Sequence, residues 1–104
     1  LAVSLPGADM EALRGMADRF RQKYPSGVAL LAAVADGKPN LIATVTKDLV
    51  ERGRHAGELV KLAAEKVDGN GGGRPDMAQA GGSDASKIDD ALAVAAGWVR
   101  DKLG

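Results

Sequence analysis

The residue types that most directly suggest chemistry lie in residues 71–82, which read Gly-Gly-Gly-Arg-Pro-Asp-Met-Ala-Gln-Ala-Gly-Gly. Three consecutive positions carry no side chain: Gly71, Gly72 and Gly73. In a tight loop their backbone N–H groups would form an anion-binding nest, and Arg74 could add a bidentate phosphate contact. The alternative is structural, with Gly69 ending a helix and the next glycines reversing the chain into an inner strand. Generic physics favours neither interpretation over the other.

The glycines match neither of the common nucleotide-binding motifs. No Gly-Lys-Ser/Thr follows them, which excludes a Walker A loop. The pattern predicts a helix before them and a strand after them, which is the reverse of the Rossmann order.

Basic side chains are close to the glycines in sequence, and they would contribute positive charge to such a site. These residues are Lys47, Arg52, Arg54 and Lys61. Glutamates are interleaved with them, a pattern that is also typical of an ordinary solvated helix. On their own the basic residues therefore indicate only a weak patch.

Catalytic and metal-binding constellations are not supported by the residue types. The chain has one histidine, His55, and no cysteine, so nucleophilic triads and thiolate metal sites lack their components. His55 is placed at a predicted helix start, which indicates a surface residue. Asp89 and Asp90 are adjacent on a predicted helix, so their side chains diverge and cannot clamp one ion. We expect no catalytic, cofactor or metal site within this chain.

Hydrophobic periodicity predicts the elements that would position these residues. Strands are expected at residues 1–5, 28–35, 41–45 and 76–80, and helices at 10–24, 55–67 and 86–100, with a short turn at 47–52. Asp9 is the expected N-cap of the first helix, and Ser86 with Asp89 resembles a capping box before the last. The order is β-α-β-β-α-β-α, which predicts a small α/β (α+β) domain over residues 1–104, with a mixed sheet and helices packed on it.

Composition limits the class of partner. The 104 residues carry 14 basic and 14 acidic side chains, and their formal net charge of zero gives no general attraction to nucleic acid. Phe20, Tyr24 and Trp98 all fall on or near apolar helix faces, so no aromatic platform for single-stranded nucleic acid is expected. The absence of a long apolar run and of cysteine predicts a soluble, cytoplasmic protein.

Two segments together resemble a known family. Residues 55–61 read His-Ala-Gly-Glu-Leu-Val-Lys, and with the glycine string of residues 71–82 they resemble DHHA1, the C-terminal domain of bacterial alanyl-tRNA synthetases. The resemblance extends over nearly the whole chain, including the Trp-Val-Arg of residues 98–100. DHH-type phosphoesterases carry the same module with a Gly-Gly-His string, but Arg74 occupies the histidine position here, which argues against a phosphoesterase substrate domain.

The resemblance implies a role as a non-catalytic part of an ATP-dependent alanine–tRNA ligase. Such domains bind the outer corner of tRNA and support aminoacylation and editing. The residues expected to contact RNA are Lys47, Arg52, Arg54, Lys61, Gly71, Gly72, Gly73 and Arg74. With a net charge of zero we expect weak affinity and a shallow salt dependence.

The other expected partners are the remaining domains of the synthetase. Weak self-association is a further expectation, although the helical segment that dimerises some members is missing from these residues. The alternative function is a docking or dimerisation module, which an exposed Trp98 surface would favour.

Overall fold

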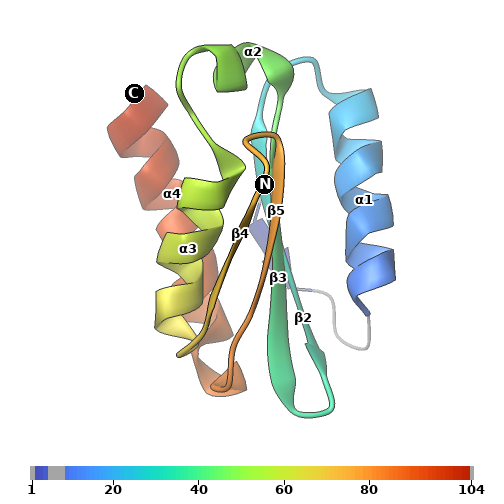
Figure 1. Ribbon diagram of the computed structural model, residues 1–104, viewed down its shortest axis with the longest axis vertical. Helices are drawn as coiled ribbons and strands as arrows, with labels where there is room; N and C mark the ends of the chain where they lie inside the picture. The colour runs from blue at the N-terminus through green and yellow to red at the C-terminus, as the bar shows by residue number, and fades with distance from the viewer. Residues whose placement is uncertain (1, 5–8, 104) are drawn as a thin grey trace.

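The computed structural model describes residues 2–4 and 9–103 (Figure 1). In chain order the elements are β1 Ala2–Ser4, α1 Met10–Lys23, β2 Val28–Ala35, β3 Lys38–Val45, α2 Lys47–Glu51, α3 Ala56–Lys66, β4 Asn70–Gly73, β5 Met77–Gly81, the 3-10 turn η1 Ala85–Lys87, and α4 Ile88–Leu103. The predicted mixed α/β fold is confirmed, with β4 as a strand that was not predicted. Leu1, Leu5 and the breaker Pro6-Gly7 lie outside the described residues.

The five strands form one sheet in the order β1-β2-β3-β5-β4. Only β1 and β2 run parallel, and α1 makes the crossover between them; the other neighbours are antiparallel. Figure 1 shows α1 on one face of the sheet and α3 with α4 on the other. The molecule is therefore a three-layer sandwich with β4 at an open edge.

Strand β2 is buried on both faces, as its continuous apolar run predicted. Leu30 and Ala32 pack in the larger cluster with α3 and α4. Leu31 and Ala33 point the other way and pack in a smaller cluster with α1. The alternation of side chains along a strand accounts for the two separate clusters.

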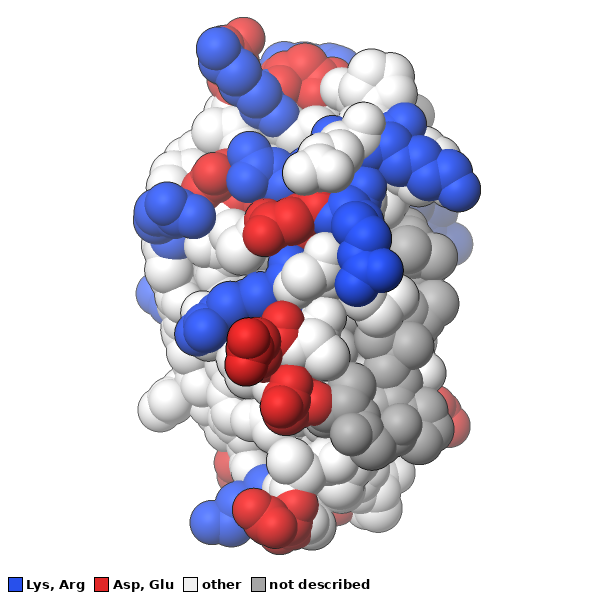
Figure 2. All heavy atoms as spheres, turned by 90° about the vertical axis from the view of Figure 1, so that its right-hand side faces the viewer, with Lys and Arg blue, Asp and Glu red and all other residues white. Residues whose placement is uncertain are grey.

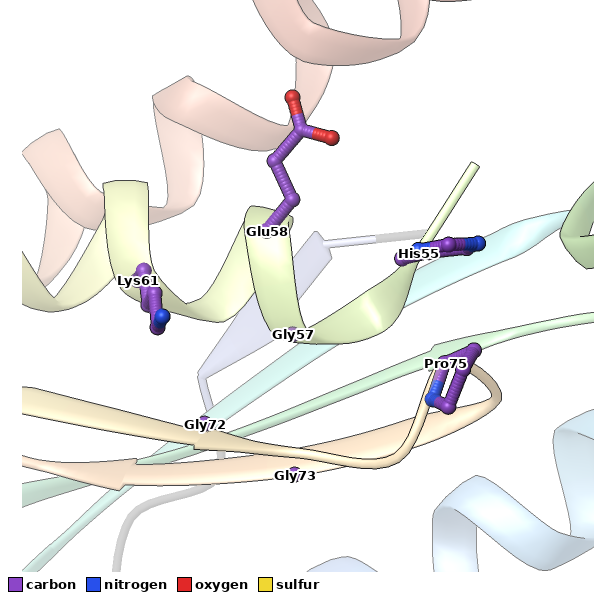
Figure 3. Close-up of a pocket in the computed structure, with 7 residues that line it drawn as sticks. All are labelled: His55, Gly57, Glu58, Lys61, Gly72, Gly73 and Pro75. Carbon is purple, nitrogen blue, oxygen red and sulfur yellow. The ribbon is translucent and has the colours of Figure 1, made fainter. Parts of the chain in front are cut away.

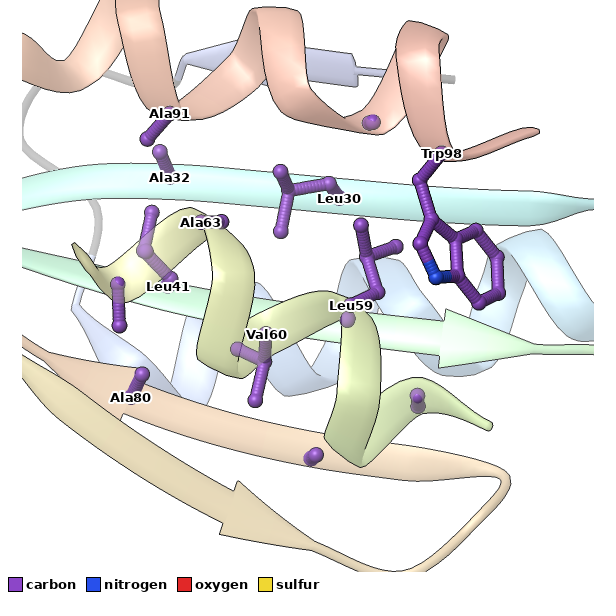
Figure 4. Packing of buried hydrophobic residues seen from close by; sticks show 14 of the residues in the cluster. Leu30, Ala32, Leu41, Leu59, Val60, Ala63, Ala80, Ala91 and Trp98 are labelled. Atoms are coloured by element: carbon purple, nitrogen blue, oxygen red, sulfur yellow. The ribbon is translucent and has the colours of Figure 1, made fainter. Parts of the chain in front are cut away.

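The larger core is built mainly from Ala, Leu and Val, so its layers pack closely. Figure 4 shows Ala32, Ala63 and Ala91 between the larger side chains of β2, β3 and α3. Trp98 closes one end of this core and is only 4% exposed. Because its ring is buried, Trp98 does not form the exposed surface that would have favoured a docking module.

The β2–β3 hairpin is tighter than the sequence indicated. Asp36 and Gly37 have φ of 53° and 74°, the positive values that a two-residue type I′ turn requires. This short turn lets β3 begin at Lys38, so the strand predicted at residues 41–45 starts three residues earlier than expected.

Aspartates cap the start of α1 and the 3-10 turn that leads into α4. Asp9 accepts a hydrogen bond from Ala12 N at 2.8 Å, which confirms the predicted cap of α1. Before α4 the cap is Asp84, whose carboxylate accepts from the backbone N–H of Ser86. The predicted capping box at Ser86 was therefore wrong, because a 3-10 turn precedes the helix.

Candidate functional site at the glycine edge strand

The consecutive glycines form an extended strand and not a loop. β4 pairs antiparallel with β5, and Gly72 lies opposite Gln79. The chain reverses only afterwards, at residues 74–76, where Arg74 N donates to Met77 O at 3.0 Å. Successive N–H groups of a strand point in opposite directions, so they cannot converge on one anion. The nest prediction, which needs a loop, was wrong.

Close approach between backbones explains why several of these positions are glycine. A Cβ at Gly69 would lie 2.0 Å from Gly81 O, one at Gly71 2.3 Å from Gln79 O, and one at Gly82 2.5 Å from Val67 O. At Gly72 the nearest atom would be Lys61 Cε at 3.6 Å, an ordinary contact. Most of these glycines are therefore required by packing, because a larger residue would not fit. Gly72 is the exception, since a side chain could be accommodated there.

Helix α3 ends in a way that the sequence did not predict. Asp68, with φ of 55°, takes the left-handed position, while Gly69 N donates to Ala64 O at 2.9 Å and Asp68 N to Glu65 O. These two bonds are the pattern of a Schellman motif. The expected helix-ending role of Gly69 thus belongs to Asp68, and Gly69 is required by its contact with Gly81.

A groove of about 410 Å³ runs between α3 and β4. Its lining residues are His55, Gly57, Glu58, Lys61, Gly72, Gly73 and Pro75. In Figure 3 the Lys61 side chain is directed toward β4, while the Glu58 carboxylate points away from the strand. One wall of the groove is thus bare glycine backbone and the other carries a cation.

The two walls are joined at one end. Ala56 N, in the first turn of α3, donates to Pro75 O at 2.7 Å. His55 is the exposed N-cap of α3 and its side chain makes no capping bond. This placement agrees with the surface role expected for the histidine.

Most of the predicted basic residues come together in one half of the molecule. α2, the start of α3 and the β4–β5 turn all lie in the upper half of Figure 1, and they carry Lys47, Arg52, Arg54 and Arg74. The Arg74 side chain is 73% exposed, and its Nε lies 3.5 Å from Asp76 Oδ1. Arg54 is different: its Nε is buried without a partner, so much of this side chain faces inward.

The end of α1 contributes residues that sequence reasoning did not include. Arg21 Nη1 lies 3.3 Å from Asp76 Oδ2, so one carboxylate holds both Arg21 and Arg74. Lys23 is exposed at the last turn of the same helix. The fold brings this end of α1 beside Arg74 and Asp76, more than fifty positions later in the sequence, which local spacing could not indicate.

The opposite half of the molecule is mainly acidic. The lower part of Figure 1 holds the β2–β3 turn, η1 and the starts of α1 and α4, where carboxylates outnumber lysines. These carboxylates include Asp9, Glu11, Asp36, Asp84, Asp89 and Asp90. Figure 2 shows the α1 face, on which basic side chains gather toward the top and are mixed with carboxylates. The net charge of zero thus conceals a separation of charge along the molecule.

The described residues offer neither a metal-binding group nor a membrane-spanning helix. Among residues 2–4 and 9–103, no three His, Asp or Glu side chains gather into a group that could hold a metal ion. In the same part of the chain no helix has the length and apolar character needed to cross a bilayer.

A family model described as the DHHA1 domain matches residues 1–101. The chain belongs to the DHHA1 family. The Alanine–tRNA ligase of Geobacillus thermodenitrificans (strain NG80-2) is 54% identical over 100 residues, which cover 96% of this DHHA1 domain and 11% of that protein. The Alanine–tRNA ligase of Bacillus subtilis (strain 168) is 52% identical over 103 residues, which cover 99% of this chain and 12% of that protein.

A solved structure supports the same assignment. The C-Ala domain from Aquifex aeolicus alanyl-tRNA synthetase superposes on this DHHA1 domain with a TM-score of 0.80 and 28% identity, covering 90% of this chain and 87% of that chain. The chain spans only 11–12% of the length of the curated ligases named above. Family and fold are thereby established for the DHHA1 domain itself.

Proposed function

We propose that this DHHA1 domain is the non-catalytic C-terminal domain of a cytoplasmic, ATP-dependent alanine–tRNA ligase, and that it binds tRNA at the outer corner, where the D- and T-loops meet. The observation that carries the proposal is identity above 50% to two ligases over almost the whole chain. Binding there supports aminoacylation and editing on one tRNA. The other domains of the ligase are its second partner, and weak self-association is a lesser one.

The proposed binding mode is recognition of shape and phosphates. The outer corner of a tRNA is a folded surface of phosphates, 2′-hydroxyls and few accessible base edges, so a protein has no groove to read there. The groove between α3 and β4 offers bare backbone at Gly72 and Gly73 with Lys61 opposite. Arg74, at the end of the same strand, projects into solvent.

The other residues expected to contact RNA differ in how directly they can reach it. Lys47, the first residue of α2, and Arg52, which follows its last residue, are both exposed and can reach phosphates. Arg54 is half-buried with its Nε out of reach of solvent, so we expect it to contact RNA less directly than the exposed residues. Gly71 lies in contact with β5, so it serves the RNA surface by keeping β4 in place.

The test is a salt titration of binding to alanine tRNA, a non-cognate tRNA and a plain RNA duplex. We expect both tRNAs to bind and the duplex to bind more weakly. Each phosphate contact contributes about 0.7 to 0.9 to the slope of log affinity against log salt. The double variant Lys61→Gln/Arg74→Gln should therefore lower that slope by about 1.4 to 1.8.

The matched control removes two exposed lysines from the acidic half. Lys38→Gln/Lys87→Gln changes the net charge by the same amount and lies away from the groove. Its slope should match that of the unsubstituted chain. Equal losses in the two double variants would show a general charge effect, and no tRNA binding at low salt would refute the proposed function.

A further inference from the structure

The Tyr24 ring is exposed at the end of α1. The sequence placed all three aromatic residues on or near apolar helix faces and predicted no aromatic platform, so this exposure was not expected. Tyr24 is the C-cap of α1, and its backbone N–H donates to Phe20 O at 2.9 Å. It is 43% exposed, and with Leu62 it is one of two large hydrophobic side chains so exposed in the described part of the chain. An exposed aromatic ring is the element that RNA-binding surfaces use to stack bases.

The Tyr24 ring packs against a core residue of α1, which limits its orientation. Phe20, one turn earlier, is 9% exposed, and its ring centroid lies 4.9 Å from that of Tyr24 at an interplanar angle of 39°. Pro25 follows immediately and ends the helix. The Tyr24 ring is thus supported by a core residue while its outer surface faces solvent.

Beside the ring is a hollow of about 340 Å³ between the end of α1 and the start of α2. Its two walls are tied together by a reciprocal pair of hydrogen bonds. Gly27 N donates to Thr46 Oγ1 at 2.9 Å, and Thr46 N donates to Gly27 O at 3.1 Å. Thr46 is 4% exposed, so the floor of the hollow is a buried polar residue held in place.

Cations surround the hollow. Arg21 and Lys47 line it, and Lys23 Nζ lies 5.5 Å from the Tyr24 ring centroid. Asp18 is the one carboxylate among the lining residues. Arg21 is held by Asp76, whereas Lys23 and Lys47 take part in no ion pair among the described residues. An aromatic face beside free ammonium groups matches a nucleobase joined to its phosphate.

We propose that this hollow is a second RNA-binding site, in which an exposed nucleobase stacks on Tyr24 while Lys47 and Lys23 bind the adjoining phosphates. This inference rests on the proposed function and adds to it a base contact at the opposite side of the β4–β5 turn from the α3–β4 groove. The long stem of Lys23 lets its ammonium move from the ring to a phosphate when the base arrives. Gln22, which also lines the hollow, supplies an amide for the base edge.

The test compares Tyr24→Leu with Tyr24→Phe for binding to tRNA and to a short single-stranded RNA. Leucine keeps an apolar contact with Phe20 but has no aromatic face, whereas phenylalanine keeps the face. Stacking on a protein aromatic is strong enough that its loss should weaken RNA binding about tenfold in Tyr24→Leu. Tyr24→Phe should bind like the unsubstituted chain.

Two controls separate stacking from other effects. Leu62→Ala removes the other exposed large hydrophobic side chain, which lies on α3, and should leave affinity unchanged. Heparin, an anion without bases, should bind Tyr24→Leu and the unsubstituted chain equally. Thermal melts establish that each variant is folded, and an upfield shift of the Tyr24 ring protons on addition of RNA reports stacking directly.

The outcomes distinguish this inference from the proposed function. If Tyr24→Leu binds RNA as well as the unsubstituted chain does while Lys61→Gln/Arg74→Gln is impaired, the base contact is refuted and the proposed function stands. If Tyr24→Leu weakens RNA and heparin binding alike, stacking is refuted. If the unsubstituted chain binds neither tRNA nor single-stranded RNA, both proposals fail.

Discussion

Replacement of Gly71 by alanine is the sharpest test of the packing role of the glycine strand. The new Cβ would lie 2.3 Å from Gln79 O and 2.5 Å from both Ala80 Cα and Ala80 Cβ. Two of these three atoms belong to the backbone of β5, which is bonded on its other side to β3. A rotamer change therefore cannot relieve the contact, and the edge strand must shift as a whole.

The size of the effect follows from that geometry. Overpacking in a well-packed region costs about 1–3 kcal/mol when side chains can adjust. Because backbone must move here, we expect the upper end of that range, a loss of about 3 kcal/mol from the free energy of unfolding. For a chain of this size a loss of 3 kcal/mol lowers Tm by roughly 12–24 °C, since each kcal/mol corresponds to about 4–8 °C.

The assay is urea unfolding followed by the fluorescence of Trp98, the single tryptophan, which is buried in the native state. With a urea dependence of about 1 kcal/mol per molar, the unfolding midpoint of Gly71→Ala should fall by about 3 M. Gly72→Ala is the matched control, because its Cβ would meet only Lys61 Cε at 3.6 Å. Alanine also has less freedom to lose in a strand, so Gly72→Ala should be neutral or more stable by about 0.5 kcal/mol.

Either of two results would refute this reasoning. One is a Gly71→Ala midpoint close to that of the unsubstituted chain, and the other is equal destabilisation by both alanines. The comparison also separates packing from binding. If Gly72→Ala is stable yet loses tRNA affinity, the bare backbone of the α3–β4 groove serves the ligand as proposed.

Two further predictions concern the core and the α2 start. Trp98→Ala should lower the free energy of unfolding by about 3–5 kcal/mol because it opens the end of the α3–α4 core, and far-UV circular dichroism in urea would measure this. Hydrogen bonds from Ser26 and Thr46 lower the pKa of Asp48, so ionised Asp48 favours the folded state. The difference in unfolding midpoint between the unsubstituted chain and Asp48→Asn should therefore be full above pH about 4 and shrink as the pH falls through the lowered pKa. A difference that grows as the pH falls would contradict this assignment.

Local side-chain patterns were sufficient to predict some elements. The apolar run of β2 and the helical spacing of α1 and α3 predicted both ends of each element to within one residue, because each element buries a continuous face. The apolar residues at helical spacing in this segment, Val60, Ala63, Ala64 and Val67, are all fully buried. At these positions local pattern and tertiary environment agree.

The glycine strand could not be predicted in the same way. β4 has almost no side chains, so neither alternation nor propensity distinguishes it from a loop. Its conformation is set by pairing with β5 and by the contacts of Gly69 and Gly71, which exist only in the folded molecule. The hollow beside Tyr24 was missed for a related reason, because Tyr24 and Lys47 are brought together by a hydrogen-bonded pair between residues 19 positions apart.

The separation of charge along the molecule changes what its net charge means. The longest dimension is 35 Å, whereas at physiological salt the Debye length is about 8 Å. Salt therefore screens the repulsion between the acidic half and a polyanion that is bound at the basic half. The equal totals of 14 basic and 14 acidic side chains then have little influence on binding. In salt as dilute as 0.01 M the Debye length grows to about 30 Å, and the acidic half begins to repel the same ligand. At that salt concentration the field of the RNA attracts one end of the domain and repels the other, so the net attraction is small. We therefore expect the domain to rotate until its basic end faces the RNA before the two molecules touch.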